Sequence, residues 1–261
     1  MGRITLSDRL RLLTVGLSLL AYWLAYGLIM LPFSWLLPLT LPCQQARELG
    51  QVVLKKFFQS VVLLLQSSGV VECEYVGFDR LHAQTGSLIV APNHPSLWDA
   101  VFVAAEVDHV ACVLKATLMR NLFLRGVATS AGFIPNEPTH KMLRRCIELL
   151  RGNERLLFFP EGTRTRPEHG SMNPLTGGLA IIAKNSGAPV WPIYVQTSSR
   201  YLNKGWPIWR LPPEKIRLRL TVGEPLVYPQ AGQPQAFLEE LRALHRGGLR
   251  RAVRQLLATK S

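Results

Sequence analysis

The feature that most limits how this chain can fold is a long apolar segment near its start. No charged residue lies between Leu12 and Ala46, and Leu12–Leu31 is a continuous, mainly apolar run of 20 residues. A helix of that length spans about 30 Å, which matches the hydrocarbon core of a bilayer. We therefore expect this segment to enter a membrane.

Basic residues precede this run, a pattern shared with secretory signal peptides: Arg3, Arg9 and Arg11. The apolar stretch is longer than a usual signal-peptide core, and no clear small-residue cleavage site follows it, so we expect it to be retained. Because the main domain beyond the run is also basic, a re-entrant, monotopic anchor fits the positive-inside rule better than a complete crossing.

Three prolines interrupt the chain after the run: Pro32, Pro38 and Pro42. They predict that the first helix ends or kinks near Leu31 and that a second helix starts around Gln44. Residues 1–68 would then form a membrane-associated helical hairpin. In the second helix, Gln51–Gln66 combines two lysines with apolar residues, which favours an interfacial position. A buried core helix is the alternative.

Residues 69–231 are expected to form an α/β domain with a largely parallel sheet flanked by helices, because short β-branched runs alternate with helical patterns. Four runs are expected strands: Ser87–Ala91, Val110–Leu114, Leu156–Phe159 and Val190–Val195. Two helices are expected: one that Thr139 caps and Gly152 ends, and Leu179–Ser186. Ligands of such sheets bind beyond the carboxyl ends of strands, so the residues after Ala91 and Phe159 are candidate site positions.

The formal net charge is +13, although only 18% of the residues are charged, compared with roughly 25% in an average soluble protein. Residues 232–261 are expected to form a basic amphipathic helix that contacts an anionic membrane surface or an acidic carrier protein. A peripheral packing helix is the alternative. The long apolar segment argues against nucleic acid as the partner. The four cysteines form no CxxC pair, so a zinc site is not expected.

The first candidate site segment is Asn93–Asp99, with the sequence NHPSLWD. His94 comes just after a strand and Asp99 in the first turn of the next helix, so the two can face each other. An imidazole can take a proton from an alcohol while a carboxylate fixes its tautomer. The alternative is a capping box in which Asp99 only completes the helix start. Ser96 is not expected to be a nucleophile, because the G-x-S-x-G elbow is absent.

The second candidate segment is Phe159–Thr165, with the sequence FPEGTRT, which follows another expected strand. A glycine turn there can present backbone N–H groups beside the Arg164 guanidinium, an arrangement suited to a phosphate or a similar anion. Taken alone, the segment is equally compatible with an ordinary turn that carries a solvated arginine.

Together the two segments resemble the H-X4-D and F-P-E-G-T-R blocks of the glycerolipid acyltransferase superfamily, typified by bacterial 1-acylglycerol-3-phosphate acyltransferases. The resemblance covers roughly Val71–Val195 and includes a hydrophobic segment at Ala188–Ile193. It implies that His94 deprotonates an acceptor hydroxyl, that Asp99 orients His94, and that the acceptor attacks an acyl-CoA or acyl-carrier-protein thioester directly. It also implies an acceptor pocket of four residues: Glu161, Gly162, Thr163 and Arg164.

The resemblance further implies an enzyme of phospholipid biosynthesis that needs no metal, redox cofactor or acyl-enzyme. Its acceptor would be a lysophospholipid or a related membrane lipid. Its location would be the inner (cytoplasmic) membrane, with the active site on the cytoplasmic face. Two rival functions remain open. One is an acyl thioesterase, in which His94 and Asp99 activate water, and the other is a non-catalytic protein that binds membranes or a carrier protein.

Two positions depart from the superfamily's usual pattern. Gly132–Asn136 ends in Asn136 where an arginine for the acceptor phosphate is common, and residues 173–177 lack a frequent lysine. Asparagine can form hydrogen bonds but supplies no charge. We therefore hypothesise a specialised acceptor, with lysophosphatidate turned over less well than another lysolipid or lipid-like alcohol.

Overall fold

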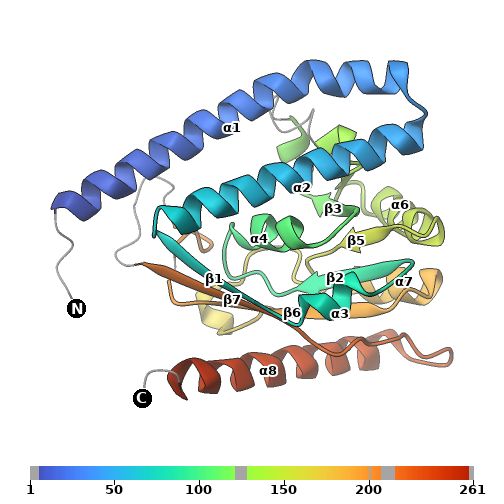
Figure 1. The fold of residues 1–261 in the computed structure, drawn as a ribbon. Coiled ribbons are helices and arrows are strands. Elements are labelled where there is room, and N and C mark those ends of the chain that lie inside the picture. Colours follow the sequence, from blue (N-terminus) through green and yellow to red (C-terminus); the bar gives the residue numbers. More distant parts are fainter. Residues whose placement is uncertain (1–5, 121–127, 200, 207–214, 259–261) are drawn as a thin grey trace.

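The computed structural model describes residues 6–120, 128–199, 201–206 and 215–258. Within these ranges a seven-stranded sheet, ordered β1-β7-β6-β2-β5-β3-β4, forms the centre of the molecule (Figure 1). The strands are β1 Val71–Val76, β2 Leu88–Pro92, β3 Val110–Leu114, β4 Ile134–Pro135, β5 Arg155–Leu157, β6 Val190–Thr197 and β7 Ile216–Val222. All neighbours pair in parallel except β6 and β7. The sheet is therefore largely parallel, as the sequence predicts.

The four strands expected from the sequence are confirmed as β2, β3, β5 and β6, and their ends differ from the expected ones by at most two residues. Three further strands lie outside those expectations: β1, β4 and β7. In β7, buried Ile216, Leu218 and Leu220 alternate with Arg217 and Arg219. This period-two pattern is typical of a strand with one face on the core, so it is a sequence signal from which β7 could have been found.

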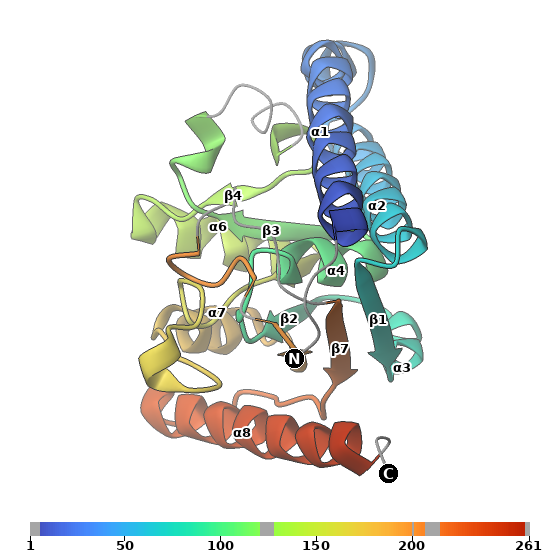
Figure 2. The same cartoon turned by 90° about the vertical axis from the view of Figure 1, so that its left-hand side faces the viewer.

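Helices cover both faces of the sheet (Figure 2). They are α1 Leu6–Thr40, α2 Cys43–Ser67, α3 Phe78–His82, α4 Asp99–Glu106, η1 Leu118–Arg120, α6 Thr139–Arg151, η2 Pro167–His169, α7 Gly178–Ser186 and α8 Pro234–Ala258. Successive residues of a strand point to opposite faces. In β2, Val90 joins the hydrophobic core formed with α2 and α4, whereas Ile89 joins the core formed with α6, α7 and α8. At β2, in the middle of the sheet, both faces are therefore buried, as is usual for parallel strands.

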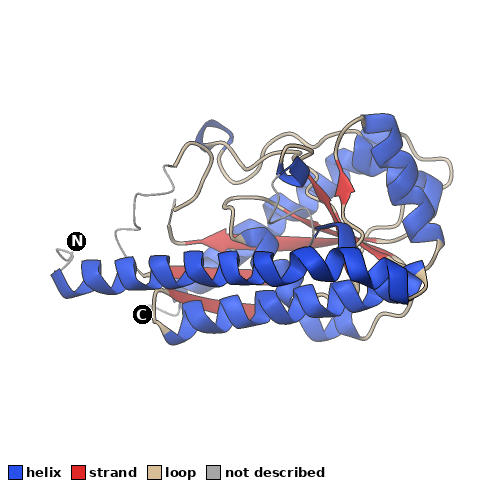
Figure 3. Cartoon of the chain, turned by 90° about the horizontal axis from the view of Figure 1, so that it is seen from above, coloured by secondary structure: helices blue, strands red, loops and turns tan. Residues whose placement is uncertain are grey.

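The amino-terminal helices form a hairpin that lies across one face of the sheet (Figure 3). The prediction that the first helix ends near Leu31 is wrong, because α1 continues to Thr40 through two prolines, whereas a kink there stays a prediction. Each proline removes one helical hydrogen bond but keeps a helical φ, and long apolar helices accommodate such interruptions. The turn lies instead at Pro42, and α2 begins at Cys43, one residue before its expected start.

The two helices of the hairpin differ in how they are covered. By length and composition α1 could cross a membrane: Leu12–Pro32 has a mean hydropathy of 1.8, and 17% of that stretch is buried inside the protein. In α2, by contrast, Leu54, Phe57, Val61 and Leu65 are each at most 4% exposed and belong to the hydrophobic core. The alternative of a core-packing helix therefore describes this face of α2. Its interfacial position stays a prediction.

The helices that the sequence predicts beyond the hairpin are present, with one difference at the start of α6. Thr139 is the first residue of α6 and not its cap, because Pro138 occupies the N-cap position, and Gly152 follows the last helical residue as expected. α7 ends before Gly187, whose φ of 72° lies in the left-handed region that favours glycine.

α8 lies on the side of the sheet opposite α1 and α2 (Figure 1) and buries Leu241 completely. The packing-helix interpretation is therefore confirmed, while contact with lipid or a carrier protein stays a prediction.

Candidate active site

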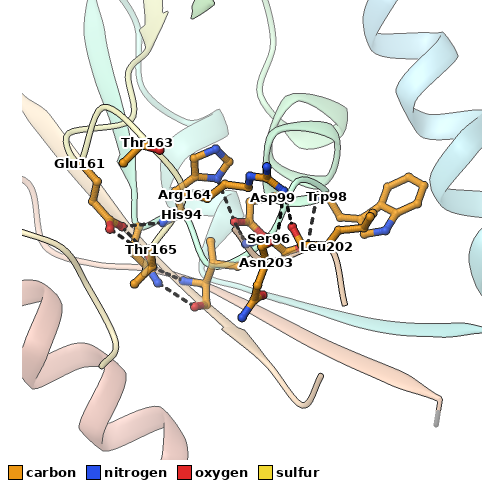
Figure 4. Close-up of polar contacts among 12 residues, drawn as sticks. His94, Ser96, Trp98, Asp99, Glu161, Thr163, Arg164, Thr165, Leu202 and Asn203 are labelled. Atoms are coloured by element: carbon orange, nitrogen blue, oxygen red, sulfur yellow. Dashed lines mark hydrogen bonds and ion pairs between the residues drawn. The ribbon is translucent and has the colours of Figure 1, made fainter. Parts of the chain in front are cut away.

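Both candidate segments follow strands that are neighbours in the sheet. Asn93–Asp99 follows β2 and Phe159–Thr165 follows β5, and these two strands pair in parallel. Parallel strands bring their carboxyl ends to one edge of a sheet, where ligands of α/β proteins bind. The two segments therefore meet at this edge, and Figure 4 shows the polar contacts that connect them.

His94 and Asp99 form the expected pair. His94 Nδ1 lies 3.1 Å from Asp99 Oδ2, and the Asp99 side chain is fully buried. The same oxygen accepts a hydrogen bond from Ser96 N–H at 2.8 Å. The capping-box alternative is not confirmed, because Trp98 is the N-cap of α4 and Asp99 is its first residue, with no side-chain cap hydrogen bond. Asp99 Oδ2 thus holds both the imidazole and the turn that precedes α4. Burial raises the pKa of Asp99, and its contacts with His94 and Ser96 oppose that shift.

The His94 ring is held so that one of its nitrogens remains available. The Asp99 carboxylate faces Nδ1 and therefore favours the tautomer that carries its proton there. The ring also packs against Phe159, with 4.1 Å between ring centroids. The His94 side chain is 15% exposed, and Nε2 has no hydrogen-bond partner among the described residues. Nε2 is thus placed to accept a proton from a bound hydroxyl.

The Glu161 carboxylate lies inside the protein and binds the main chain around His94. Glu161 is 4% exposed, its Oε1 accepts His94 N–H at 2.7 Å, and its Oε2 accepts Asn173 N–H at 2.7 Å. Thr165 donates its hydroxyl to Glu161 and its N–H to the His94 carbonyl. Burial raises the pKa of Glu161, against the effect of these donors. The contacts fit a positioning role, and direct contact of Glu161 with an acceptor stays a prediction.

The rest of the expected acceptor segment forms an exposed turn. Gly162 and Thr163 are both exposed, and the φ of Gly162, 66°, lies in the region that favours glycine. Arg164 is half-buried, and its Nη1 donates to the main-chain carbonyls of Leu202 at 2.7 Å and Asn203 at 3.2 Å. The structure therefore brings Arg164 to the expected place but gives it protein partners that the sequence does not predict.

Two buried asparagines support the site and lie outside the expected set. The Asn93 amide exchanges two hydrogen bonds with the main chain of Val195, at 2.7 and 3.0 Å, and so continues the pairing of β2 with β6. Asn173 donates to the Arg164 carbonyl at 3.1 Å and accepts Arg166 N–H at 2.9 Å, which holds the turn together. An amide suits both positions because it donates and accepts at once. The sequence signal for Asn93 is its place beside His94 after a buried strand, whereas Asn173 has no local signal.

Known proteins are similar to the part of the chain that holds both segments. The model of a family described as Acyltransferase matches residues 73–196, a range that includes both candidate segments. Over these residues the chain is similar to that family. Its fold class agrees: the crystal structure of the 1-acyl-sn-glycerophosphate (LPA) acyltransferase PlsC from Thermotoga maritima superposes with a TM-score of 0.70, at 19% identity, over 93% of this chain and 97% of that one.

Two relatives show how far the sequence similarity extends. The chloroplastic 1-acyl-sn-glycerol-3-phosphate acyltransferase BAT2 of Brassica napus is 25% identical over 134 residues, which are 49% of this chain and 38% of the relative. A 1-acyl-sn-glycerol-3-phosphate acyltransferase of Helicobacter pylori is 28% identical over 164 residues, which are 60% of this chain and 66% of the relative. The chain thus spans less than two thirds of the length of each relative.

Asn136, which is expected to depart from the superfamily's usual pattern, has a structural role here. Asn136 Oδ1 accepts Ala116 N–H at 2.9 Å, so the amide ties β4 to the chain that leaves β3. Exposed Lys115 directly follows β3, which is parallel to β5 and therefore ends at the same edge as the site. Lys115 is a positive charge outside the expected site residues, and its place directly after an expected strand is its signal in the sequence.

Proposed function

We propose that this protein transfers a fatty acyl group from acyl-CoA or acyl-carrier protein to a hydroxyl of a lysophospholipid or related lipid. The observation that carries the proposal is the His94–Asp99 pair, which leaves Nε2 without a partner among the described residues at the ligand-binding edge of the sheet. The names of the Brassica and Helicobacter relatives, both 1-acyl-sn-glycerol-3-phosphate acyltransferases, support it.

In the proposed reaction, His94 Nε2 takes the proton of the acceptor hydroxyl while that oxygen attacks the thioester carbonyl carbon. Asp99 keeps the other proton on Nδ1 and stabilises the imidazolium that forms. As the ester C–O bond is completed, the C–S bond breaks, and the leaving thiolate receives the proton from His94. Ser96 Oγ donates to the Tyr201 carbonyl at 3.1 Å, which supports direct transfer without an acyl-serine intermediate. The reaction balances without a metal or a redox cofactor.

The proposed acceptor is an anionic lysolipid. Arg164 lies next in sequence to Thr165, which is hydrogen-bonded to His94, and a guanidinium suits a phosphate or carboxylate headgroup. Asn136 supplies no charge, so we retain the hypothesis that lysophosphatidate is turned over less well than another lysolipid. Equal or better efficiency with lysophosphatidate would remove the basis of that hypothesis.

The proposed location is the inner (cytoplasmic) membrane, with the active site on the cytoplasmic side, where acyl thioesters are available. Support comes from α1, whose apolar stretch Leu12–Pro32 is long enough to enter a bilayer and is mostly uncovered by the rest of the protein. A monotopic anchor would leave the acceptor lipid within reach of the edge of the sheet.

The test measures the rate at which the full chain, in detergent, releases thiol from a long-chain acyl thioester. The rate is compared with and without lysophosphatidate and other lysolipids. His94→Ala should lower the acceptor-dependent rate by about 10² to 10⁴, the usual contribution of a general base. His140→Ala is the matched control, because His140 is an exposed histidine at the start of α6.

Each outcome of this assay separates the candidate functions. Release that requires an acceptor and collapses only in His94→Ala supports acyl transfer through the pair. Release that needs no acceptor identifies a thioesterase. A rate that does not respond to His94→Ala removes the proposed mechanism, and an absence of release with every thioester and acceptor favours a non-catalytic role.

A further inference from the structure

A third segment, residues 201–203, contacts both candidate segments at once (Figure 4). From the first segment, Ser96 Oγ donates to the Tyr201 carbonyl and Leu97 N–H donates to the Leu202 carbonyl at 3.3 Å. From the second, Arg164 Nη1 donates to the same Leu202 carbonyl at 2.7 Å. A single main-chain oxygen therefore joins the two segments, and it lies 38 residues beyond Arg164 along the chain.

The backbone of Leu202 is held in an unusual conformation at this point. Its φ is 59°, in the left-handed region that residues with a branched side chain seldom adopt. The Leu202 side chain is buried, with 6% of the residue exposed, so it is held by packing as well as by its carbonyl contacts. Conformations of this kind persist where the surroundings determine them, and they concentrate at functional sites.

The contacts with residues 202 and 203 fix the direction of the Arg164 guanidinium. Nη1 donates to the carbonyls of both Leu202 and Asn203. These two hydrogen bonds from one nitrogen restrict the orientation of the guanidinium. Its Nη2 and Nε have no hydrogen-bond partner among the described residues. A guanidinium has five N–H donors in a rigid fork, so Nη2 and Nε remain to bind an anion. An arginine already held in place loses less side-chain entropy when a ligand binds.

We propose that Leu202 is a positioning residue for the acceptor: its left-handed backbone places the carbonyl that holds Arg164 toward the anionic headgroup of the lysolipid. The inference rests on the proposed function, because it assigns Arg164 to the acceptor and not to the thioester. Backbone conformation and side-chain burial at residue 202 can be changed separately. Their effects on acceptor binding can therefore be told apart.

The experiment compares Leu202→Val with Leu202→Asn in the acceptor-dependent thiol-release assay. Valine keeps an apolar side chain but is β-branched and disfavours positive φ, whereas asparagine is polar but adopts positive φ readily. Leu202→Val should raise the KM for the acceptor about tenfold, with little change in the KM for the thioester. Leu202→Asn should raise the acceptor KM much less, even though losing a buried apolar side chain lowers its thermal stability.

Arg164→Ala provides the second readout. If Leu202 acts through Arg164, adding Leu202→Val to the Arg164→Ala variant should cause little further rise in the acceptor KM. The inference is overturned if the asparagine variant is the more impaired in acceptor KM, or if the Leu202→Val effect persists in full without Arg164. Should Leu202→Val fail to fold, the asparagine variant decides alone, since an acceptor KM as high as that of Arg164→Ala contradicts the inference. Loss of acceptor dependence in the parent would instead refute the proposed function.

Discussion

Two buried carboxylates bind His94 from different elements, and they act on different parts of it. Asp99, at the start of α4, reaches the imidazole Nδ1, whereas Glu161, in the turn after β5, reaches the backbone N–H of the same residue at 2.7 Å. Burial raises the pKa of both carboxyls. The comparison indicates a division of roles in which Asp99 controls the protonation of the ring and Glu161 controls the position of the loop that carries it.

The largest effect should come from replacing the carboxylate that faces the ring. Asp99→Asn keeps the size of the side chain but can no longer stabilise the imidazolium or select the Nδ1–H tautomer, so kcat should fall by about 10³. Acceptor and thioester KM values should change little, because the pair acts on the proton. The thiol-release assay measures this, and a decrease of less than tenfold would contradict the role given to Asp99.

A smaller effect on rate, accompanied by a loss of stability, is expected at the other carboxylate. Glu161→Gln keeps one acceptor oxygen but turns an NH₂ group toward the backbone N–H of either His94 or Asn173, so the free energy of unfolding should fall by about 1–3 kcal/mol. The kcat should fall only about tenfold, because the ring chemistry is intact. Urea unfolding and thiol release measure the two quantities.

The control for that variant is Glu168→Gln, which changes an exposed carboxylate near the same turn and should alter neither quantity. If Glu161→Gln lowers kcat as much as Asp99→Asn and leaves stability unchanged, the division of roles is wrong.

The smallest effect concerns the pH dependence of stability. Because burial raises the pKa of Glu161, the folded state binds its proton more tightly than the unfolded state does. This contribution is fully present below the unfolded pKa, about 4.3 for Glu, and is lost as pH rises through the raised folded pKa. The parent should therefore lose more unfolding free energy than Glu161→Gln as the pH rises from about 4.3 through the raised folded pKa. Urea unfolding across this range measures both slopes, and equal slopes would contradict the raised pKa.

The sequence patterns succeeded where the relevant interactions are local. Period and composition identified the buried strands β2, β3, β5 and β6, and Gly152 and Gly187 marked the ends of α6 and α7. Local rules failed at the prolines of α1, where a long apolar helix continues despite them. A proline favours a break in a helix because it removes a hydrogen bond. In α1 the rest of the helix is stable enough to continue without that bond.

The sequence by itself determined the fold class, through the alternation of strand and helix patterns, and it placed His94 and Asp99 close enough along the chain to face each other. Only the tertiary structure decided that Glu161 turns inward to His94, 67 residues away, and that Arg164 binds the Leu202 carbonyl. The physical reason is that the side chain of a turn residue takes its direction from its hydrogen-bond partners. Here those partners belong to segments that follow β2, β5 and β6, which come together only when the sheet is assembled.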